Sequence, residues 1–243
     1  MRALVTGGGV RVGAAIALAL AAEGFDLALH YNRSQKPAAD LAARIESTGR
    51  RVTLIQADLA TPQGCESVAE AAGEIDVLVN NAAIYSAVPI AEITPQQWDT
   101  MLAINCRAPF LLTQGLLPAL RRSALPGGGL VINIGDIGGE RPVPGYTHYS
   151  VSKAGILMLT KAMALELAPE VRVNAISPGT VIAPEDFTEQ ALSAIRQTIP
   201  AGRFGSGEDI ARTAVFLVRS PYITGQIIAV DGGRSIGGPM EAG

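Results

Sequence analysis

The feature that most constrains the fold is a regular alternation of short apolar runs with longer segments of helical periodicity. Runs rich in β-branched residues predict strands over 2–6, 25–31, 52–56, 75–80, 130–135, 171–177 and 226–230. Between them, helices are predicted over 13–23, 37–47, 66–73, 95–122, 146–167 and 208–219, with an irregular helical region over 184–202. Continuously apolar strands separated by helices indicate a parallel sheet covered on both faces. We therefore expect one doubly wound α/β domain over residues 1–243, with about seven strands.

The composition excludes several classes of protein. Apolar residues make up 48% of the chain and charged residues 17%, which excludes a disordered or collagen-like chain. The net charge of −3, without a basic cluster, argues against nucleic acid as a partner. The longest apolar stretch is too short to span a bilayer, and the N-terminus lacks a signal-peptide pattern. Two separated cysteines and two histidines leave little for a disulfide framework or a metal site. We expect a cytoplasmic protein with a small-molecule substrate and no metal, membrane or nucleic-acid partner.

A glycine-rich turn lies between the first predicted strand and the first predicted helix. Residues 6–13 read TGGGVRVG. Such a turn lets backbone N–H groups approach a pyrophosphate, and the helix dipole favours the anion. A tight turn alone would explain the glycines equally well, but dinucleotide folds bind their ligand after the first strand. We therefore predict nucleotide binding at this loop.

The end of the second predicted strand indicates which nucleotide is preferred. Residues 30–34 read HYNRS, with no carboxylate to hold the ribose hydroxyls. Arg33 and Ser34 favour a 2′-phosphate instead, which predicts NADPH as the cofactor. The alternative is a solvated loop arginine. Asp58, after the third strand, is expected either at the adenine edge or as a helix-capping residue.

Tyr149 and Lys153 lie four residues apart in YSVSK, a spacing that puts both on one face of a helix. An ammonium group beside a phenol lowers the pKa of the phenol, so Tyr149 is expected to act as an acid or base near neutral pH. Such a pair is also typical of an ordinary surface. The glycine loop, NNAA over 80–83 and Asn105 in the long helix favour catalysis. His148 is expected to point away from this site, to the surface or an interface.

Together these residues resemble the short-chain dehydrogenase/reductase family, and the resemblance covers essentially the whole chain. The matching motifs are TGGGVRVG, NNAA, Asn105, YSVSK, Pro178-Gly179 and TGQIIAVDGG over 224–233. The resemblance implies a Rossmann fold in which Tyr149 donates the proton and Lys153 binds the nicotinamide ribose and tunes the tyrosine. Asn105 would hold a water in a proton relay. It also implies a homotetramer and a substrate lid over about 181–203.

The loop, the turn and the resemblance together define a set of expected cofactor contacts. These are Gly7, Arg11, Val12, His30, Tyr31, Asn32, Arg33, Ser34, Asp58, Leu59, Asn81, Ala82, Ala83, Tyr149, Lys153, Pro178, Gly179 and Val181.

Two positions depart from the family and match its pteridine reductase subgroup. The serine expected thirteen residues before the tyrosine is replaced by Asp136, and the middle glycine of the loop by Arg11. The turn at 30–34, GYTHY over 145–149 and YITG over 222–225 also agree with that subgroup. The resemblance therefore implies Asp136 as a further catalytic residue.

The same subgroup implies where a pterin ring would bind. Tyr85 occupies the position of an aromatic residue that stacks on the pterin, although packing under a loop would explain it nearly as well. The pteridine reductases of parasites have a phenylalanine at the position of Tyr85 and a serine at the position of Ala83. The expected substrate contacts are Arg11, Tyr85, Asp136 and Tyr149.

The substrate class depends most on Asp136. An ionised carboxylate opposes the negative charge that carbonyl reduction builds on oxygen. Reduction of a pterin C=N bond needs a proton on nitrogen instead, which a Tyr149–Asp136 pair sharing a proton would supply. The alternative for Asp136 is a loop residue that caps local N–H groups. Our leading hypothesis is an NADPH-dependent reductase of pterins or dihydropterins. The alternatives are a carbonyl reductase, such as one acting on 3-oxoacyl thioesters, and a non-catalytic NADP-binding sensor.

Overall fold

The computed structural model describes residues 1–181 and 188–237. Its strands are β1 (Arg2–Val5), β2 (Asp26–Tyr31), β3 (Val52–Gln56), β4 (Val77–Asn80), β5 (Gly129–Ile134), β6 (Val171–Pro178) and β7 (Ile227–Val230). Its α-helices are α1 (Arg11–Ala22), α2 (Gln35–Glu46), α3 (Pro62–Ala72), α4 (Pro95–Leu102), α5 (Ala108–Arg121), α6 (Thr147–Leu167), α7 (Glu189–Gln197) and α8 (Gly207–Val218). All seven predicted strands are present.

The strands form one parallel sheet in the order β3-β2-β1-β4-β5-β6-β7. Every residue of β4, β5 and β6 is buried, as expected of strands covered on both sides. The predicted single Rossmann-type α/β domain with a seven-stranded sheet is confirmed.

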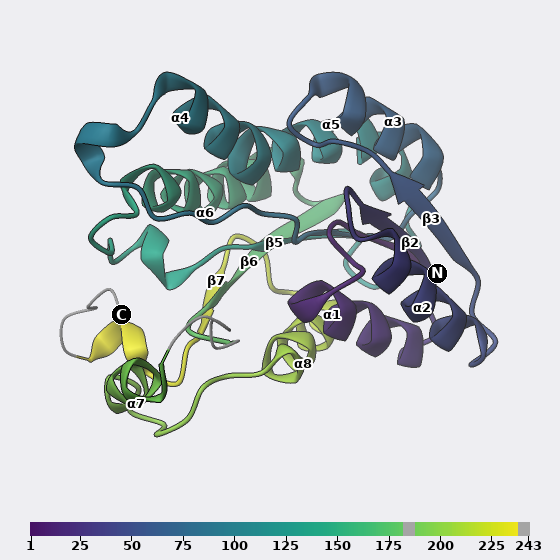
Figure 1. The fold of residues 1–243 in the computed structure, drawn as a ribbon. Coiled ribbons are helices and arrows are strands. Elements are labelled where there is room, and N and C mark those ends of the chain that lie inside the picture. The colour runs from purple at the N-terminus through teal and green to yellow at the C-terminus, as the bar shows by residue number, and fades with distance from the viewer. Residues whose placement is uncertain (182–187, 238–243) are drawn as a thin grey trace.

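Helices cover both faces of the sheet (Figure 1). On one face α1, α2 and α8 pack against the strands, with Ile16, Leu41 and Leu217 in the core. On the other face α3, α5 and α6 contribute Val68, Leu112 and Met163. Full burial of one such side chain contributes about 1.5–3 kcal/mol, so the two apolar layers hold the strand ends in fixed positions. Within the described residues, no helix combines the length and the apolar character needed to cross a membrane.

The long helix predicted over 95–122 is interrupted, which corrects the sequence analysis. Helix α4 ends at Leu102, a π-helical turn spans Ala103–Arg107, and α5 follows. The N–H of Ala108 donates to the carbonyl of Ala103, five residues back. The next residue, Pro109, has no N–H to donate to the carbonyl of Asn105, so the regular α-helical bond cannot form there. The turn displaces Asn105 from a regular helical face.

Of the irregular helical region predicted over 184–202, the structure describes residues 188–202, and only part of these are helical. Helix α7 covers only Glu189–Gln197, and the Thr188 hydroxyl caps it by accepting a hydrogen bond from the N–H of Ala191. Residues 182–187 lie outside the described residues. The predicted lid over 181–203 falls partly on them and stays a prediction.

Candidate active site

A cleft of about 890 Å³ lies at the carboxyl ends of the strands. Strand order reverses between β1 and β4, and such a switch point is where doubly wound folds bind their ligands. All the predicted cofactor and substrate contacts line this cleft. Among the predicted catalytic residues, Asp136, Tyr149 and Lys153 line it, and Asn105 does not. Tyr146, Thr180 and Arg234, which the sequence analysis did not single out, line it as well.

The glycine loop between β1 and α1 forms a tight cradle. Gly7 has a φ of +60°, which a side chain would strain. A Cβ at Gly13 would lie 2.3 Å from the carbonyl oxygen of Gly7, so only glycine fits there. Arg11 also has a positive φ, of 52°, which explains why a glycine is the usual residue at this position of the loop. This cradle, which Cβ atoms would fill, fits a pyrophosphate at the N-terminus of α1.

The side chain of His30, at the end of β2, forms a hydrogen bond with the backbone of the glycine loop. Its Nδ1 accepts a hydrogen bond from the N–H of Gly7 at 3.3 Å, and its Nε2 lies 3.1 Å from the carbonyl oxygen of Ala57. This pattern requires the neutral ring with its proton on Nε2. His30 is 2% exposed, and burial lowers its pKa, which keeps the ring neutral.

The turn after β2 presents its polar side chains to the open end of the cleft. Arg33 is exposed and Ser34 half-buried, and both line the cleft. The Asn32 side chain donates to Asp58 Oδ1 at 3.4 Å, and the same oxygen accepts from the N–H of Ala60 at 3.0 Å. Thr61, not Asp58, caps helix α3. The contact of Arg33 and Ser34 with a 2′-phosphate stays a prediction.

Asp136 and Tyr149 form the central hydrogen bond of the site. The Tyr149 hydroxyl donates to Asp136 Oδ2 at 2.8 Å, while Asp136 Oδ1 accepts from the N–H of Gly138 at 2.6 Å. The contacts expected from both interpretations of Asp136 are therefore present, one on each carboxylate oxygen, and its catalytic role stays a prediction. The local cap orients the carboxylate, and its second oxygen holds the phenol.

The pKa of Tyr149 is shifted upward, opposite to the downward shift expected from the sequence. Burial raises the pKa of Tyr149 well above its ordinary value, and the Asp136 carboxylate raises it further. Lys153 is buried and donates to the carbonyl oxygen of Ile134 at 2.9 Å, with its Nζ 5.7 Å from the centre of the Tyr149 ring. Burial also lowers the pKa of Lys153. The carboxylate and the burial outweigh the ammonium, because the carboxylate contacts the hydroxyl directly and the ammonium does not.

Asn105, in the π-helical turn, clamps the segment that follows β4. Its Oδ1 accepts from the N–H of Ile84 at 2.9 Å, and its Nδ2 donates to the carbonyl oxygen of Ile84 at 3.0 Å. Nδ2 also lies 3.0 Å from the hydroxyl of Ser152 on α6. Asn105 thus fixes the backbone beside Tyr85, and its expected place in a proton relay stays a prediction.

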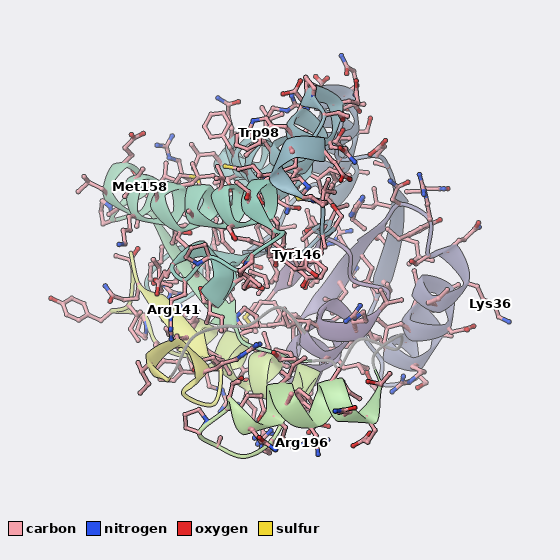
Figure 2. All side chains as sticks on the ribbon, turned by 60° about the vertical axis from the view of Figure 1, so that its left-hand side comes forward. Lys36, Trp98, Arg141, Tyr146, Met158 and Arg196 are labelled. Atoms are coloured by element: carbon pink, nitrogen blue, oxygen red, sulfur yellow. The ribbon has the colours of Figure 1, made fainter. Side chains whose placement is uncertain are left out.

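The rings of Tyr85 and Tyr146 pack against each other and against the ring of Tyr149. Tyr85 stacks on Tyr146 with ring centres 4.6 Å apart and meets the edge of Tyr149 at 4.8 Å. Tyr85 is 61% exposed, so it is not simply packed under a loop. Figure 2 shows Tyr146 near the middle of the molecule. Its position three residues before Tyr149, at the N-cap of α6, was a signal in the sequence that would have found it.

His148 is not on the surface, which corrects the sequence analysis. It is 1% exposed, and its Nε2 lies 3.3 Å from the hydroxyl of Ser86. The side chain points toward the segment after β4, which covers it. It therefore links α6 to the segment that presents Tyr85.

Comparison with known proteins identifies the family. The family described as enoyl-(acyl carrier protein) reductase matches residues 9–235. The 3-oxoacyl-acyl-carrier-protein reductase FabG of Staphylococcus epidermidis is 36% identical over 95% of this chain and 97% of its own. The chain belongs to the short-chain dehydrogenase/reductase family. The homologues are named reductases, which agrees with the expected oxidoreductase class.

Solved structures of this family match over nearly their whole length. A short chain dehydrogenase from Burkholderia cenocepacia in complex with NADP has 35% identity and a TM-score of 0.88, covering 96% of this chain and 97% of the other. A blue fluorescent protein from a metagenomic library, in complex with NADPH, has 36% identity and a TM-score of 0.88, covering 96% of both chains. The curated relative named above is a 3-oxoacyl reductase. Its name agrees with the carbonyl reductase alternative and not with the pteridine reductase subgroup.

Proposed function

We propose that this protein is an NADPH-dependent reductase of a C=N bond in a pterin or dihydropterin ring. The proposal depends on one observation, the 2.8 Å hydrogen bond from Tyr149 to the Asp136 carboxylate. A hydroxyl at position 136 would help Tyr149 to hold a carbonyl oxygen. A carboxylate there instead suits a substrate edge that presents N–H donors, as a pterin does.

The residues of the cleft fit the proposed cofactor. The cradle of Gly7 and Gly13 at the N-terminus of α1 would hold the pyrophosphate. Arg33 and Ser34 would hold the 2′-phosphate, which suits NADPH better than NADH. The complexes of the two structural relatives with NADP and NADPH support this choice.

The mechanism follows from which groups of the site hold protons and which accept hydrogen bonds. Bound NADPH supplies the hydride. Tyr149 stays protonated at neutral pH because burial and Asp136 raise its pKa, so its Oη holds the proton that the substrate nitrogen needs. Asp136 accepts hydrogen bonds from the substrate's N–H groups while the N–H of Gly138 keeps its carboxylate in place. Tyr85 is 61% exposed and would offer the ring face that is not stacked on Tyr146 to a planar substrate.

A second candidate function is the reduction of 3-oxoacyl thioesters. The name of the Staphylococcus relative favours it. In that case the Asp136 carboxylate would oppose the reaction, because an ionised carboxylate repels the oxyanion that forms beside Tyr149.

A paired substrate assay separates the two functions. Loss of NADPH absorbance is followed with dihydrobiopterin, dihydrofolate and an acetoacetyl thioester as substrates. We expect turnover of a pterin, which Asp136→Asn and Asp136→Ser lower by roughly 10²-fold or more. Asp40→Asn, an exposed aspartate on α2, is the matched control and should leave the rate unchanged. Efficient thioester reduction without any pterin turnover would overturn the proposal in favour of the second candidate.

A further inference from the structure

We propose that Arg234 binds an oxyanion of the substrate, a carboxylate or a phosphate, at the wall of the cleft formed by the turn after β7. This inference rests on the proposed function and adds to it an acidic substituent on the reduced ring. It is carried by the placement of a half-buried guanidinium in the wall of the cleft, to which the described residues supply no carboxylate partner.

The turn after β7 holds Arg234 in place. The Asp231 carboxylate accepts hydrogen bonds from the N–H groups of Gly233 at 2.9 Å and Ser235 at 2.6 Å, which closes the turn. Gly233 has a φ of +87°, a value that favours glycine. A short 3₁₀ helix over Arg234–Ile236 follows. The backbone at Arg234 therefore has a defined direction.

A second arginine ties this turn to the segment that follows Asp136. The Nη1 of Arg141 donates to the carbonyl oxygens of Ser235 at 2.5 Å and Gly237 at 2.9 Å, and lies 3.3 Å from that of Arg234. Figure 2 shows Arg141 beside the yellow C-terminal part of the chain. The two walls of the cleft that contain Asp136 and Arg234 are thus connected directly.

The guanidinium itself is oriented by two hydroxyls. Its Nη1 donates to Thr180, and its Nε donates to Thr198 at 3.2 Å. A guanidinium has five N–H donors, so these two bonds leave three for which the described residues supply no hydrogen bond. Neutral hydroxyls fix the group without neutralising its charge.

Within the part of the chain that the structure describes, nothing compensates the charge of Arg234 at short range. Among the described residues no carboxylate lies within 4.0 Å of it, whereas Arg51, Arg122 and Arg219 each form an ion pair. Burial lowers the pKa of Arg234, and the more distant Asp136 carboxylate opposes this. Partial burial of a cation without an ion-pair partner costs free energy, and the binding of an anion offsets this cost.

These charges select a substrate with two unlike ends. Asp136 accepts from N–H donors at the ring, and Arg234, in the lining of the same cleft, donates to an acceptor on the ring's substituent. A ring with an uncharged side chain satisfies only the first group. A ring that bears a carboxylate or phosphate satisfies both, in the forked geometry that a guanidinium prefers.

The test compares acids with their own neutral esters. The kcat/KM of the wild type is measured with dihydrofolate and its dimethyl ester, and with dihydroneopterin with and without its phosphate. The dihydrofolate pair measures the preference for a carboxylate, and the dihydroneopterin pair measures the preference for a phosphate. We expect the wild type to prefer at least one charged form by about tenfold or more, a difference of about 1.4 kcal/mol.

Variants connect that preference to Arg234. Arg234→Gln should abolish the preference by raising KM for the charged form while leaving the neutral form within about threefold. Arg234→Lys should retain part of it. Arg212→Gln, an exposed arginine on α8, is the control and should change nothing. Equal loss with charged and neutral forms would show a merely structural role and overturn the proposal, as would a wild type without charge preference.

Failure of the proposed function is read separately. If the wild type reduces no pterin, charged and neutral forms are compared in two other ways. Methotrexate and its dimethyl ester are titrated into the protein–NADP⁺ complex by calorimetry. Levulinate and methyl levulinate are compared as carbonyl substrates in the NADPH assay. A charge preference lost in Arg234→Gln then supports Arg234 while the pterin function fails. Its absence from every pair overturns the role of Arg234.

Discussion

At the scale of single residues, turnover depends most directly on the hydroxyl of Tyr149. Tyr149→Phe removes that hydroxyl and leaves the ring packed against Tyr85. We predict that turnover falls by roughly 10²–10⁴-fold, as is typical for the loss of a general acid, while NADPH affinity changes little. Steady-state kinetics and a fluorescence titration of NADPH measure the two effects. Turnover within a few-fold of the wild type would rule out this role.

Cofactor preference is a second property of a single side chain. Arg33→Ala removes a charge-assisted contact to the 2′-phosphate, which typically contributes about 1.5–3 kcal/mol. We therefore predict that NADPH affinity falls roughly 10- to 100-fold and NADH affinity changes little. Arg44→Ala, an exposed arginine on α2, is the control. Equal affinity of the wild type for NADPH and NADH would contradict the prediction.

His30 predicts a pH dependence of stability. Burial lowers its pKa in the folded protein below the ordinary value of about 6.5, so below that pH the unfolded chain binds more protons than the folded one. The contribution of the neutral ring is fully present above about pH 6.5 and falls as pH drops toward the folded pKa. Urea unfolding across this range measures it. His30→Gln should flatten the slope there, and an unchanged slope would assign it to other groups.

At the scale of elements, the π-helical turn positions the segment that presents Tyr85. Asn105→Ala leaves the N–H and carbonyl of Ile84 without partners, a loss of about 1–3 kcal/mol each where buried. We predict a raised KM for the substrate, lower stability and a KM for NADPH that changes much less. Asn105→Asp retains the acceptor for the N–H of Ile84 and should be milder in KM. A selective loss of kcat would favour the proton-relay role instead.

At the scale of the whole molecule, α6 has an apolar stripe that the monomer does not cover. Val151, Met158 and Leu165 are seven residues apart and are 42%, 64% and 84% exposed. Figure 2 shows Met158 and Lys36 on opposite sides of the molecule. We predict a homotetramer that uses this stripe, which Met158→Glu dissociates and Lys36→Glu does not. Light scattering at micromolar concentration measures the mass, and a monomeric wild type would refute the prediction.

The sequence by itself determined the sheet, the cradle and most of the cleft lining. Strand positions were readable because a parallel strand buried on both faces must be apolar throughout, as β4 and β5 are. Tyr149 and Lys153 were readable because helical spacing is local. Asp136 was expected beside Tyr149 because of the resemblance to the pteridine reductase subgroup, in which an aspartate stands thirteen residues before the tyrosine.

Only the tertiary structure decided the features that depend on distant contacts. The π-helical turn at Asn105, the burial of His148 and the direction of the Tyr149 pKa shift depend on what packs against each group. Arg234 lies 98 residues beyond Asp136 in the chain, and no local pattern connects them. A short turn, two threonines and Arg141 bring them to one cleft. Desolvation and charge depend on spatial neighbours, which a local sequence pattern does not contain.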